Sequence, residues 1–184
     1  MNKNVVILKF STRARGNCTK IGAYLENYYK RTNVCSYSVE IQPCGECDYE
    51  CLDPAAVCPR VTESFRQIMD AVCASDLTYF VIPNYCGYPC AAYFAFNERT
   101  VGYFNMDRKL LDRYLSVKKR FIVVSNTEGD SFRNALQQQT NEEPDIFYLK
   151  SGKYQKRSTA GDILESQDAV AELKNYLNQY RLSD

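Results

Sequence analysis

The stretch VVILKFSTRARGNCTK, residues 5–20, decides the fold of this 184-residue chain. Residues 5–10 form an apolar, β-branched run that is typical of a strand buried on both faces. Residues 11–20 are mostly polar, and Ile21, Tyr24, Leu25 and Tyr28 then recur at helical spacing. The order is therefore strand, loop, helix, which is how a parallel α/β fold begins.

The same two periodicities continue along the chain. Residues 34–41 alternate between apolar and polar side chains, which indicates a half-exposed strand at a sheet edge. Residues 77–83 are nearly all apolar, and we expect this strand to stop at Pro83 because proline lacks the backbone donor. The other expected strands are 121–124 and 145–150, and the expected helices are 61–72 with Thr62 as a cap, 90–99, 107–115, 131–139 and 170–180.

Strands that alternate with helices predict right-handed crossovers and a parallel sheet that is covered by helices on both faces. We expect a single domain over residues 1–184, with a cysteine-rich insert at about 42–60. Ligands of such folds bind at the carboxyl ends of the strands. Three of the expected loops lie there, at residues 11–19, 83–89 and 125–130.

Composition narrows the class of ligand. The 23 Lys and Arg balance 22 Asp and Glu, so no charge excess calls for nucleic acid or an anionic membrane, and a small molecule is expected. No stretch reaches the roughly 20 apolar residues of a membrane span, and the first apolar run is too short for a secretory signal. We expect a cytoplasmic protein, in which the nine cysteines stay reduced rather than form a disulfide framework.

The loop at residues 11–19 carries donors that suit a phosphate. They are Ser11, Thr12, Arg13, Asn17 and Thr19, and they precede a helix whose first N–H groups and dipole favour an anion. The alternative is that Asn17 or Thr19 only caps the helix and that Arg13 is solvated. The loop is neither a Walker loop nor a G-x-G-x-x-G fingerprint, so a mononucleotide is favoured over a dinucleotide or ATP.

The loop at residues 83–89 suits a flat ligand. Tyr85 and Tyr88 offer aromatic surface, and Gly87 gives the backbone freedom between two prolines. The alternative is that both tyrosines serve packing, in a chain that has 15 tyrosines. The loop SNTEGD at residues 125–130 adds further polar donors, but alone it is a weak signal.

Taken together, these motifs resemble a known family. S-x-R-x-x-G-N follows the first strand, the cysteine-rich insert follows the second, P-x-Y follows the third, and F-x-E-R comes later, all within about residues 4–130. This order resembles the NADPH-dependent FMN reductases, and the insert resembles that of the iron–sulfur flavoproteins. The resemblance implies a flavodoxin-like, doubly wound sheet of five parallel strands in the order 2-1-3-4-5. The chain departs from the family at Phe10, where Gly is usual, and at Cys18, where Ser or Thr is common.

The resemblance also assigns site residues. It places the FMN phosphate at Ser11, Arg13, Asn17, Cys18 and Thr19. It places the isoalloxazine ring at Pro83, Asn84, Tyr85, Cys86 and Gly87, with Ser125, Asn126, Thr127 and Gly129 closing the pocket. The F-x-E-R element, here Phe96, Glu98 and Arg99, usually serves packing or the subunit interface. No catalytic side chain is assigned.

The insert holds four cysteines, Cys44, Cys47, Cys51 and Cys58, with the spacing C-x2-C-x3-C-x6-C. Four thiolates can ligate a [4Fe-4S] cluster or a zinc ion. The compact motif of the iron–sulfur flavoproteins has two residues, not three, between its second and third cysteines. Buried metal-free thiols and redox pairing stay open as alternatives, because spacing alone selects a metal weakly.

The resemblance implies an FMN-dependent oxidoreductase that takes hydride from NAD(P)H and passes electrons to a quinone, a flavin or another small acceptor. The chain has no histidine, which excludes Ser-His-Asp and Cys-His hydrolases. One alternative is an iron–sulfur electron carrier that serves a protein partner. Another is a non-catalytic phosphate-binding module with a zinc-stapled loop. A homodimer or homotetramer is expected, with the aromatic runs at 91–96 and 101–104 as interface or core.

Overall fold

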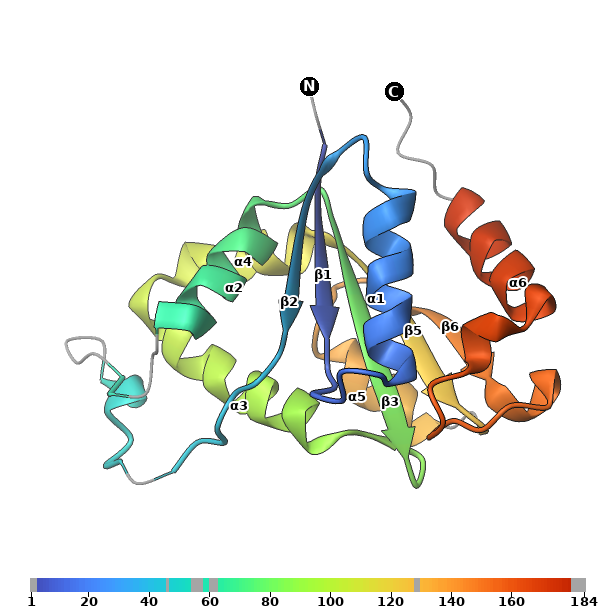
Figure 1. Ribbon diagram of the computed structural model, residues 1–184. Coiled ribbons are helices and arrows are strands. Elements are labelled where there is room, and N and C mark those ends of the chain that lie inside the picture. Colours follow the sequence, from blue (N-terminus) through green and yellow to red (C-terminus); the bar gives the residue numbers. More distant parts are fainter. Residues whose placement is uncertain (1–2, 46, 54–57, 60–62, 128–129, 180–184) are drawn as a thin grey trace.

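The computed structural model describes residues 3–45, 47–53, 58–59, 63–127 and 130–179 (Figure 1). Its strands are β1 Asn4–Lys9, β2 Asn33–Ser38, β3 Leu77–Tyr85, β4 Tyr88–Pro89, β5 Lys118–Ser125 and β6 Asp145–Lys150. Its helices are α1 Asn17–Tyr28, α2 Glu63–Ala74, α3 Ala91–Met106, α4 Arg108–Ser116, α5 Asp130–Gln137 and α6 Gln167–Asn178. Short 3-10 turns occur at η1 Glu50–Leu52, η2 Ser151–Tyr154 and η3 Ile163–Glu165.

In the described part of the chain the strands form one sheet with the order β2-β1-β3-β5-β6, and every neighbouring pair along this path is parallel. Numbered along the chain without the two-residue β4, this is the predicted order 2-1-3-4-5. β2 lies at an edge of the sheet, as its alternating sequence predicted. It ends at Ser38 rather than at residue 41, because its partner β1 ends at Lys9.

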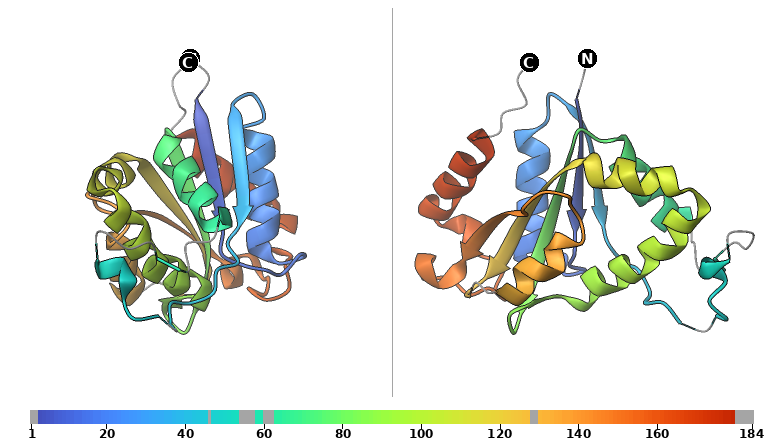
Figure 2. Two further views of the ribbon diagram at one scale, coloured as in Figure 1. Left: turned by 90° about the vertical axis from the view of Figure 1, so that its left-hand side faces the viewer. Right: turned by 180° about the vertical axis from the view of Figure 1, so that it is seen from behind.

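Helices cover both faces of the sheet (Figures 1 and 2). On one face α1 and α6 pack on alternate strand residues such as Val5, Ile7 and Val81. On the other face α2, α3, α4 and α5 pack on the intervening residues such as Leu8 and Ile82. The β-branched and apolar strands therefore bury both of their faces, which is what a parallel sheet between two helical layers requires.

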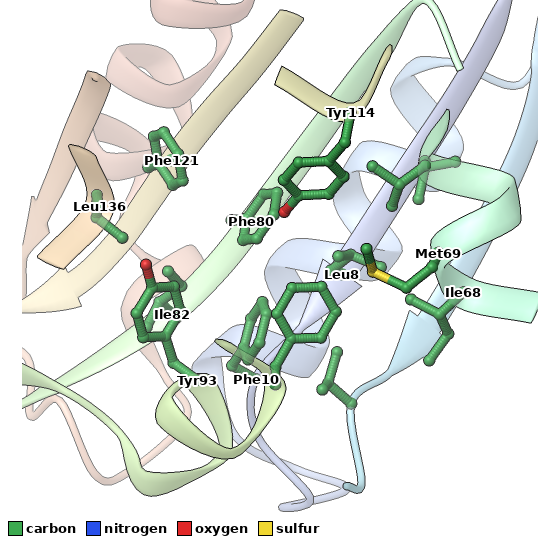
Figure 3. Close-up of a cluster of buried hydrophobic side chains, with 14 of the residues drawn as sticks. Leu8, Phe10, Ile68, Met69, Phe80, Ile82, Tyr93, Tyr114, Phe121 and Leu136 are labelled. Atoms are coloured by element: carbon green, nitrogen blue, oxygen red, sulfur yellow. The ribbon is translucent and has the colours of Figure 1, made fainter. Parts of the chain in front are cut away.

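Phe10 lies in the core between the sheet and the helices α2, α3, α4 and α5 (Figure 3). Its ring stacks on Phe80 with a centroid distance of 5.6 Å and an interplanar angle of 15°, and it meets Phe96 edge-on at 5.6 Å. It is 1% exposed. Phe10, which follows β1 directly, thus contacts β3 and α3 at the point where the first loop begins.

The prediction that the third strand stops at Pro83 is wrong. β3 runs on to Tyr85, with Pro83 paired to Val124 of β5. The carbonyl of Val81 accepts from the N–H of Phe10 at 2.9 Å, so the backbone polar groups of Val81 point toward β1. The backbone nitrogen of Pro83, two residues later, points to the same side. β1 has ended at this level, and the donor that proline lacks is therefore not needed by a neighbouring strand.

The predicted loop after Pro83 is instead a tight hairpin. Tyr85 of β3 pairs with Tyr88 of the antiparallel strand β4. Cys86 and Gly87 between them have φ values of 55° and 88°, which is the pair of positive φ angles that a two-residue type I′ turn requires. The hairpin gives the carboxyl end of β3 a defined shape.

The proposed helix cap Thr62, the closing residue Tyr180 and the pocket residue Gly129 lie outside the described residues. None of the helices in the described part has the length and apolarity that crossing a membrane demands. In the aromatic runs of α3, Tyr93, Phe96 and Tyr103 belong to the core, whereas Phe94 and Val101 are 41% and 47% exposed. A subunit interface at the exposed positions stays a prediction.

Candidate functional site

The three predicted loops meet at one edge of the sheet, below the carboxyl ends of β1, β3 and β5 in Figure 1. A small cavity lies between the first two of these loops and the end of β5. Its lining combines the first loop, the end of β3, the end of β5 and a fourth segment after β6, and consists of Ser11, Arg13, Gly16, Asn17, Cys18, Pro83, Tyr85, Val124, Ser158 and Thr159. Six of the predicted cofactor-binding residues therefore surround one space.

No side chain caps the amino end of α1, whose N-cap is Gly16. The loop before it is tightly folded, because the N–H of Gly16 donates to the carbonyl of Arg13 at 2.9 Å and the N–H of Arg13 to Ser11 Oγ at 3.4 Å. The first turn of α1 thus presents backbone donors next to an exposed guanidinium and a hydroxyl.

Two of the predicted phosphate contacts are used within the protein. Thr19 Oγ1 donates to the carbonyl of Arg13 at 2.8 Å and supports the loop from inside. Asn17 is buried, its Nδ2 donates to the carbonyl of Ser158 at 2.9 Å, and its Oδ1 accepts from the N–H of Ile163 at 3.1 Å. Neither side chain caps α1, so the capping alternative is wrong for both.

Cys18 stands on the first turn of α1 and is buried. Burial, with the neighbouring Cys90 thiol, raises the pKa of Cys18 to about 12. The Cys90 thiol, whose pKa burial also raises, lies 3.2 Å from the carbonyl oxygen of Phe10 and donates to it. Both groups stay neutral at physiological pH and add no negative charge beside the amino end of α1.

The tips of β3 and β5 are tied together. Asn84 Nδ2 lies 2.6 Å from Ser125 Oγ and 3.3 Å from Thr127 Oγ1, and Asn84 Oδ1 accepts from the N–H of Gly87 at 2.9 Å. The N–H of Thr127 in turn donates to Ser125 Oγ at 2.9 Å. One asparagine therefore sets the position of the hairpin relative to the third loop.

The hairpin presents aromatic surface at its tip. Tyr85 is 48% exposed and Tyr88 is 53% exposed, on either side of the exposed Cys86. The packing alternative for these two tyrosines does not hold. Exposed aromatic rings on a rigid turn are suited to contact with a planar ligand.

Asn126, the remaining described residue of the third loop, turns toward the segment after β6. Its Oδ1 accepts from the hydroxyl of Ser151 and from the N–H of Gly152, the latter at 3.2 Å. Sequence reasoning missed this segment, and with it Ser158 and Thr159. The signal was available, since β6 ends at the same edge of the sheet and the polar stretch SGKYQKRSTAGD follows it at once.

The cysteine insert docks on α3, away from the cavity. The N–H of Cys44 donates to Glu98 Oε2 at 3.0 Å. One turn further, a Cβ on Gly102 would lie 3.0 Å from Cys58 Cβ and 3.6 Å from Cys51 Cβ, so both cysteines rest against the same point of the helix.

Burial raises the pKa of Cys51, and the nearby thiols of Cys58, Cys44 and Cys47 raise it further. The four predicted ligands thus gather in one region. In the described ranges, however, no three Cys, His, Asp or Glu side chains are placed to hold a metal ion. The metal assignment therefore stays a prediction.

The F-x-E-R element serves packing in this chain. Phe96 is fully buried, Glu98 holds the insert, and Arg99 is 4% exposed with its guanidinium 5.9 Å from the centroid of the Phe65 ring. These contacts join α3 to α2 and to the insert.

Solved structures share the architecture of the chain. Smu.1420 from Streptococcus mutans UA159 superposes with a TM-score of 0.64 at 14% identity, over 95% of this chain and 100% of that chain. The strand order β2-β1-β3-β5-β6 is the flavodoxin-like order and decides the fold. The chain has the flavodoxin-like fold. Trp repressor binding protein from Bacillus subtilis gives 0.60 at 15% identity, over 99% and 100%. FerB, a flavoenzyme NAD(P)H:(acceptor) oxidoreductase from Paracoccus denitrificans, gives 0.56 at 15% identity, over 96% of each chain.

The sequence itself matches no protein-family model and no curated protein. The predicted resemblance to the FMN reductases is thus confirmed at the level of the flavodoxin-like fold. At identities near 15% the shared fold does not carry activity with it, so the chemistry must be argued from the site.

Proposed function

We propose that this chain is an FMN-dependent oxidoreductase that accepts hydride from NAD(P)H and reduces a quinone, a flavin or another small acceptor. One observation carries the proposal: the uncapped amino end of α1 and the tips of β3 and β5 converge on one side of the sheet. In a flavodoxin-like sheet this edge is the ligand-binding edge. FerB, a flavoenzyme NAD(P)H:(acceptor) oxidoreductase, shares this fold, which supports the proposal.

The donor set fits the phosphate of FMN. The first N–H groups of α1 point outward from a helix without a side-chain cap, and the positive end of the helix dipole adds to them. The Ser11 hydroxyl and the Arg13 guanidinium flank this end. Arg15 and Arg157 are exposed on the first loop and on the segment that packs against it, so the surroundings carry positive charge.

The hairpin fits the isoalloxazine ring. Tyr85 and Tyr88 supply exposed aromatic faces, and the type I′ turn at Cys86 and Gly87 places backbone without a bulky side chain at its tip. Asn84 holds this turn against the third loop through Ser125. Because the contacts are made before any ligand arrives, little ordering entropy is lost on binding.

Bound FMN would supply the redox chemistry, taking hydride from a nicotinamide and passing electrons on. The chain's own part is to bind and orient. It has no histidine, and the thiols of Cys18 and Cys90 keep their protons, so the described site offers no general base with a pKa near neutrality. The Asn84–Ser125 contact fixes the hairpin against the third loop, and these two segments would hold the ring.

The proposal is tested by loading the purified chain with FMN under anaerobic conditions and adding NADPH or NADH. We expect the visible absorbance of the flavin to bleach in proportion to the nicotinamide added and to return when a quinone is supplied. Flavin binding without bleaching would contradict the reductase. A chain that takes up no flavin would instead favour the non-catalytic phosphate-binding module.

A second candidate function is an iron–sulfur electron carrier that serves a protein partner. Its support is the gathering of Cys44, Cys47 and Cys58 around Cys51 on α3. These thiols are not arranged around one point in the described residues, so a cluster would require the insert to rearrange. Iron, zinc and sulfide analysis of anaerobically purified protein decides between this carrier and a chain that uses flavin alone.

A further inference from the structure

The segment after β6 crosses the phosphate-binding end of the site. We call residues 156–162 the strap. Its turn at residues 158–161 packs on the first loop so closely that Gly161, with φ 75°, has no room for a side chain: a Cβ there would run into the carbonyl oxygen of Arg15. Ser158 and Thr159 of the strap line the cavity opposite Ser11 and Arg13.

The strap is held at both of its ends. Before it, the Asn126 amide oxygen accepts from Ser151 and Gly152. Lys156 pairs with Asp162 at 3.6 Å and with Glu165 at 3.2 Å, which draws the two ends of the strap together. After it, Ile163 is fully buried in the core that α1 and α6 share.

Asn17 locks the strap to α1. Asn17 is only 3% exposed. Its Nδ2 donates to the carbonyl of Ser158 in the strap, and its Oδ1 accepts from the N–H of Ile163, the residue that follows the strap. The cavity that the strap and the first loop line together with the ends of β3 and β5 has a volume of about 20 Å³. This is about the space of one water molecule, so a phosphate enters only when the strap shifts slightly.

We propose that the strap closes the phosphate end of the flavin site and thereby selects FMN, with its terminal phosphate, against FAD. This inference rests on the proposed function. FAD carries an adenylyl group on the same phosphate. Because Ser158 and Thr159 line the cavity together with Ser11 and Arg13, and Gly161 packs on Arg15, an adenylyl group on a phosphate bound there would meet the strap. A terminal phosphate needs a small shift of the strap, whereas a diphosphate with its nucleoside needs the strap removed.

The free-energy cost of removing the strap is what would make FAD bind more weakly than FMN. Lifting it away breaks both hydrogen bonds of the buried Asn17 side chain, and a buried amide left without partners is unfavourable. FMN avoids this cost. If a small shift of the strap moves the Ser158 carbonyl away from Asn17 Nδ2, a phosphate oxygen of FMN can accept from Nδ2 in its place. We expect the wild-type chain to bind FMN at least about tenfold more tightly than FAD.

The experiment measures dissociation constants for FMN, FAD and riboflavin by quenching of flavin fluorescence. Gly161→Ala forces the strap off Arg15, and Gly152→Ala is its matched control in the same segment, because a Cβ there meets only Asn126 Oδ1 at 3.9 Å. Should Gly161→Ala fail to fold, the double variant Ser158→Gly with Thr159→Gly widens the same opening from two surface positions.

The opened variants are expected to bind FAD at least about tenfold more tightly than wild type does, while Gly152→Ala keeps the wild-type preference. Wild-type affinities for FMN and FAD within threefold of each other would overturn the inference and leave the flavin site standing. So would an FMN preference that survives in the opened variants. A wild-type chain that binds none of the three flavins would instead contradict the proposed function, on which the inference rests.

Discussion

Asn84 Nδ2 lies 2.6 Å from Ser125 Oγ, and this contact joins the tip of β3 to the tip of β5. The same Asn84 side chain accepts from the N–H of Gly87 in the hairpin turn. The two loops expected to hold a flavin ring are therefore one hydrogen-bonded unit. Their relative position depends on a single amide.

Replacing Asn84 by Ala should weaken FMN binding by about two- to tenfold, because a typical hydrogen bond contributes about 0.5–1.5 kcal/mol. Asn33→Ala is the matched control. The Asn33 amide also bonds to a side chain, that of Asn4 at 2.9 Å, but at the opposite end of the sheet. Titration of both variants with FMN checks the effect, and equal losses in both would count against the linked loops.

Replacing Arg13 by Ala should lower the affinity for FMN by about tenfold or more, since hydrogen bonds to charged groups contribute about 1.5–3 kcal/mol. Riboflavin, which has no phosphate, should bind the variant as it binds the wild type. Arg31→Ala removes an exposed guanidinium at the far end of α1 and should change neither constant. A parallel loss of riboflavin affinity in Arg13→Ala would show that Arg13 does not act through the phosphate.

Lys119 should make stability depend on pH. Burial lowers its pKa from 10.5 to about 7. Its ammonium group donates to the carbonyls of Tyr114 and Val117 and lies over the Tyr114 ring. The unfolded chain then binds more protons than the folded one between pH 7 and 10.5, so this group's contribution to stability rises with pH in that window.

Lys119→Met should therefore be more stable than the wild type at pH 7. The difference between the two free energies of unfolding should shrink by up to about 1.4 kcal/mol per pH unit as the pH rises toward 10. Urea denaturation at several pH values measures this difference. Lys118→Met, at the exposed neighbouring position, is the control, and a pH-independent difference for Lys119→Met would refute the assignment.

Gly102→Ala should loosen the cysteine insert. The new methyl group would sit 3.2 Å from Cys58 Sγ and 3.0 Å from its Cβ, closer than packed side chains tolerate. We expect Cys51 and Cys58 to react faster with a thiol reagent in this variant than in Val101→Ala, which truncates an exposed neighbour on the same helix. Unchanged rates would mean that the insert does not depend on its contact with α3.

Much of the fold was predictable because its signals are local. The apolar runs of β1, β3 and β5 and the helical spacing after residue 20 predicted the parallel sheet, and the loops between them predicted the edge at which Ser11, Asn84 and Ser125 lie. The type of each element follows from periodicity alone, since side chains repeat every two residues in a strand and about every 3.6 in a helix.

What sequence reasoning missed depends on contacts between distant residues. Whether Pro83 ends β3 depends on where β1 ends beside it, which no local pattern encodes. Asn17 was predicted as a phosphate contact or a cap, yet its partners Ser158 and Ile163 lie 141 and 146 residues further along the chain. The polar stretch after β6 can be read in the sequence, but its contact with α1 follows only from the fold, which brings Asn17 to Ser158 and Ile163.

The most direct test of the central claim is an equilibrium titration of the purified, flavin-free chain with FMN, followed by flavin fluorescence. The account predicts saturable binding of one FMN per chain that is weakened when Arg13 is replaced by Ala. Absence of saturation over the whole accessible range of FMN concentration, or binding that Arg13→Ala leaves unchanged, would contradict a flavin site at the tips of β1, β3 and β5.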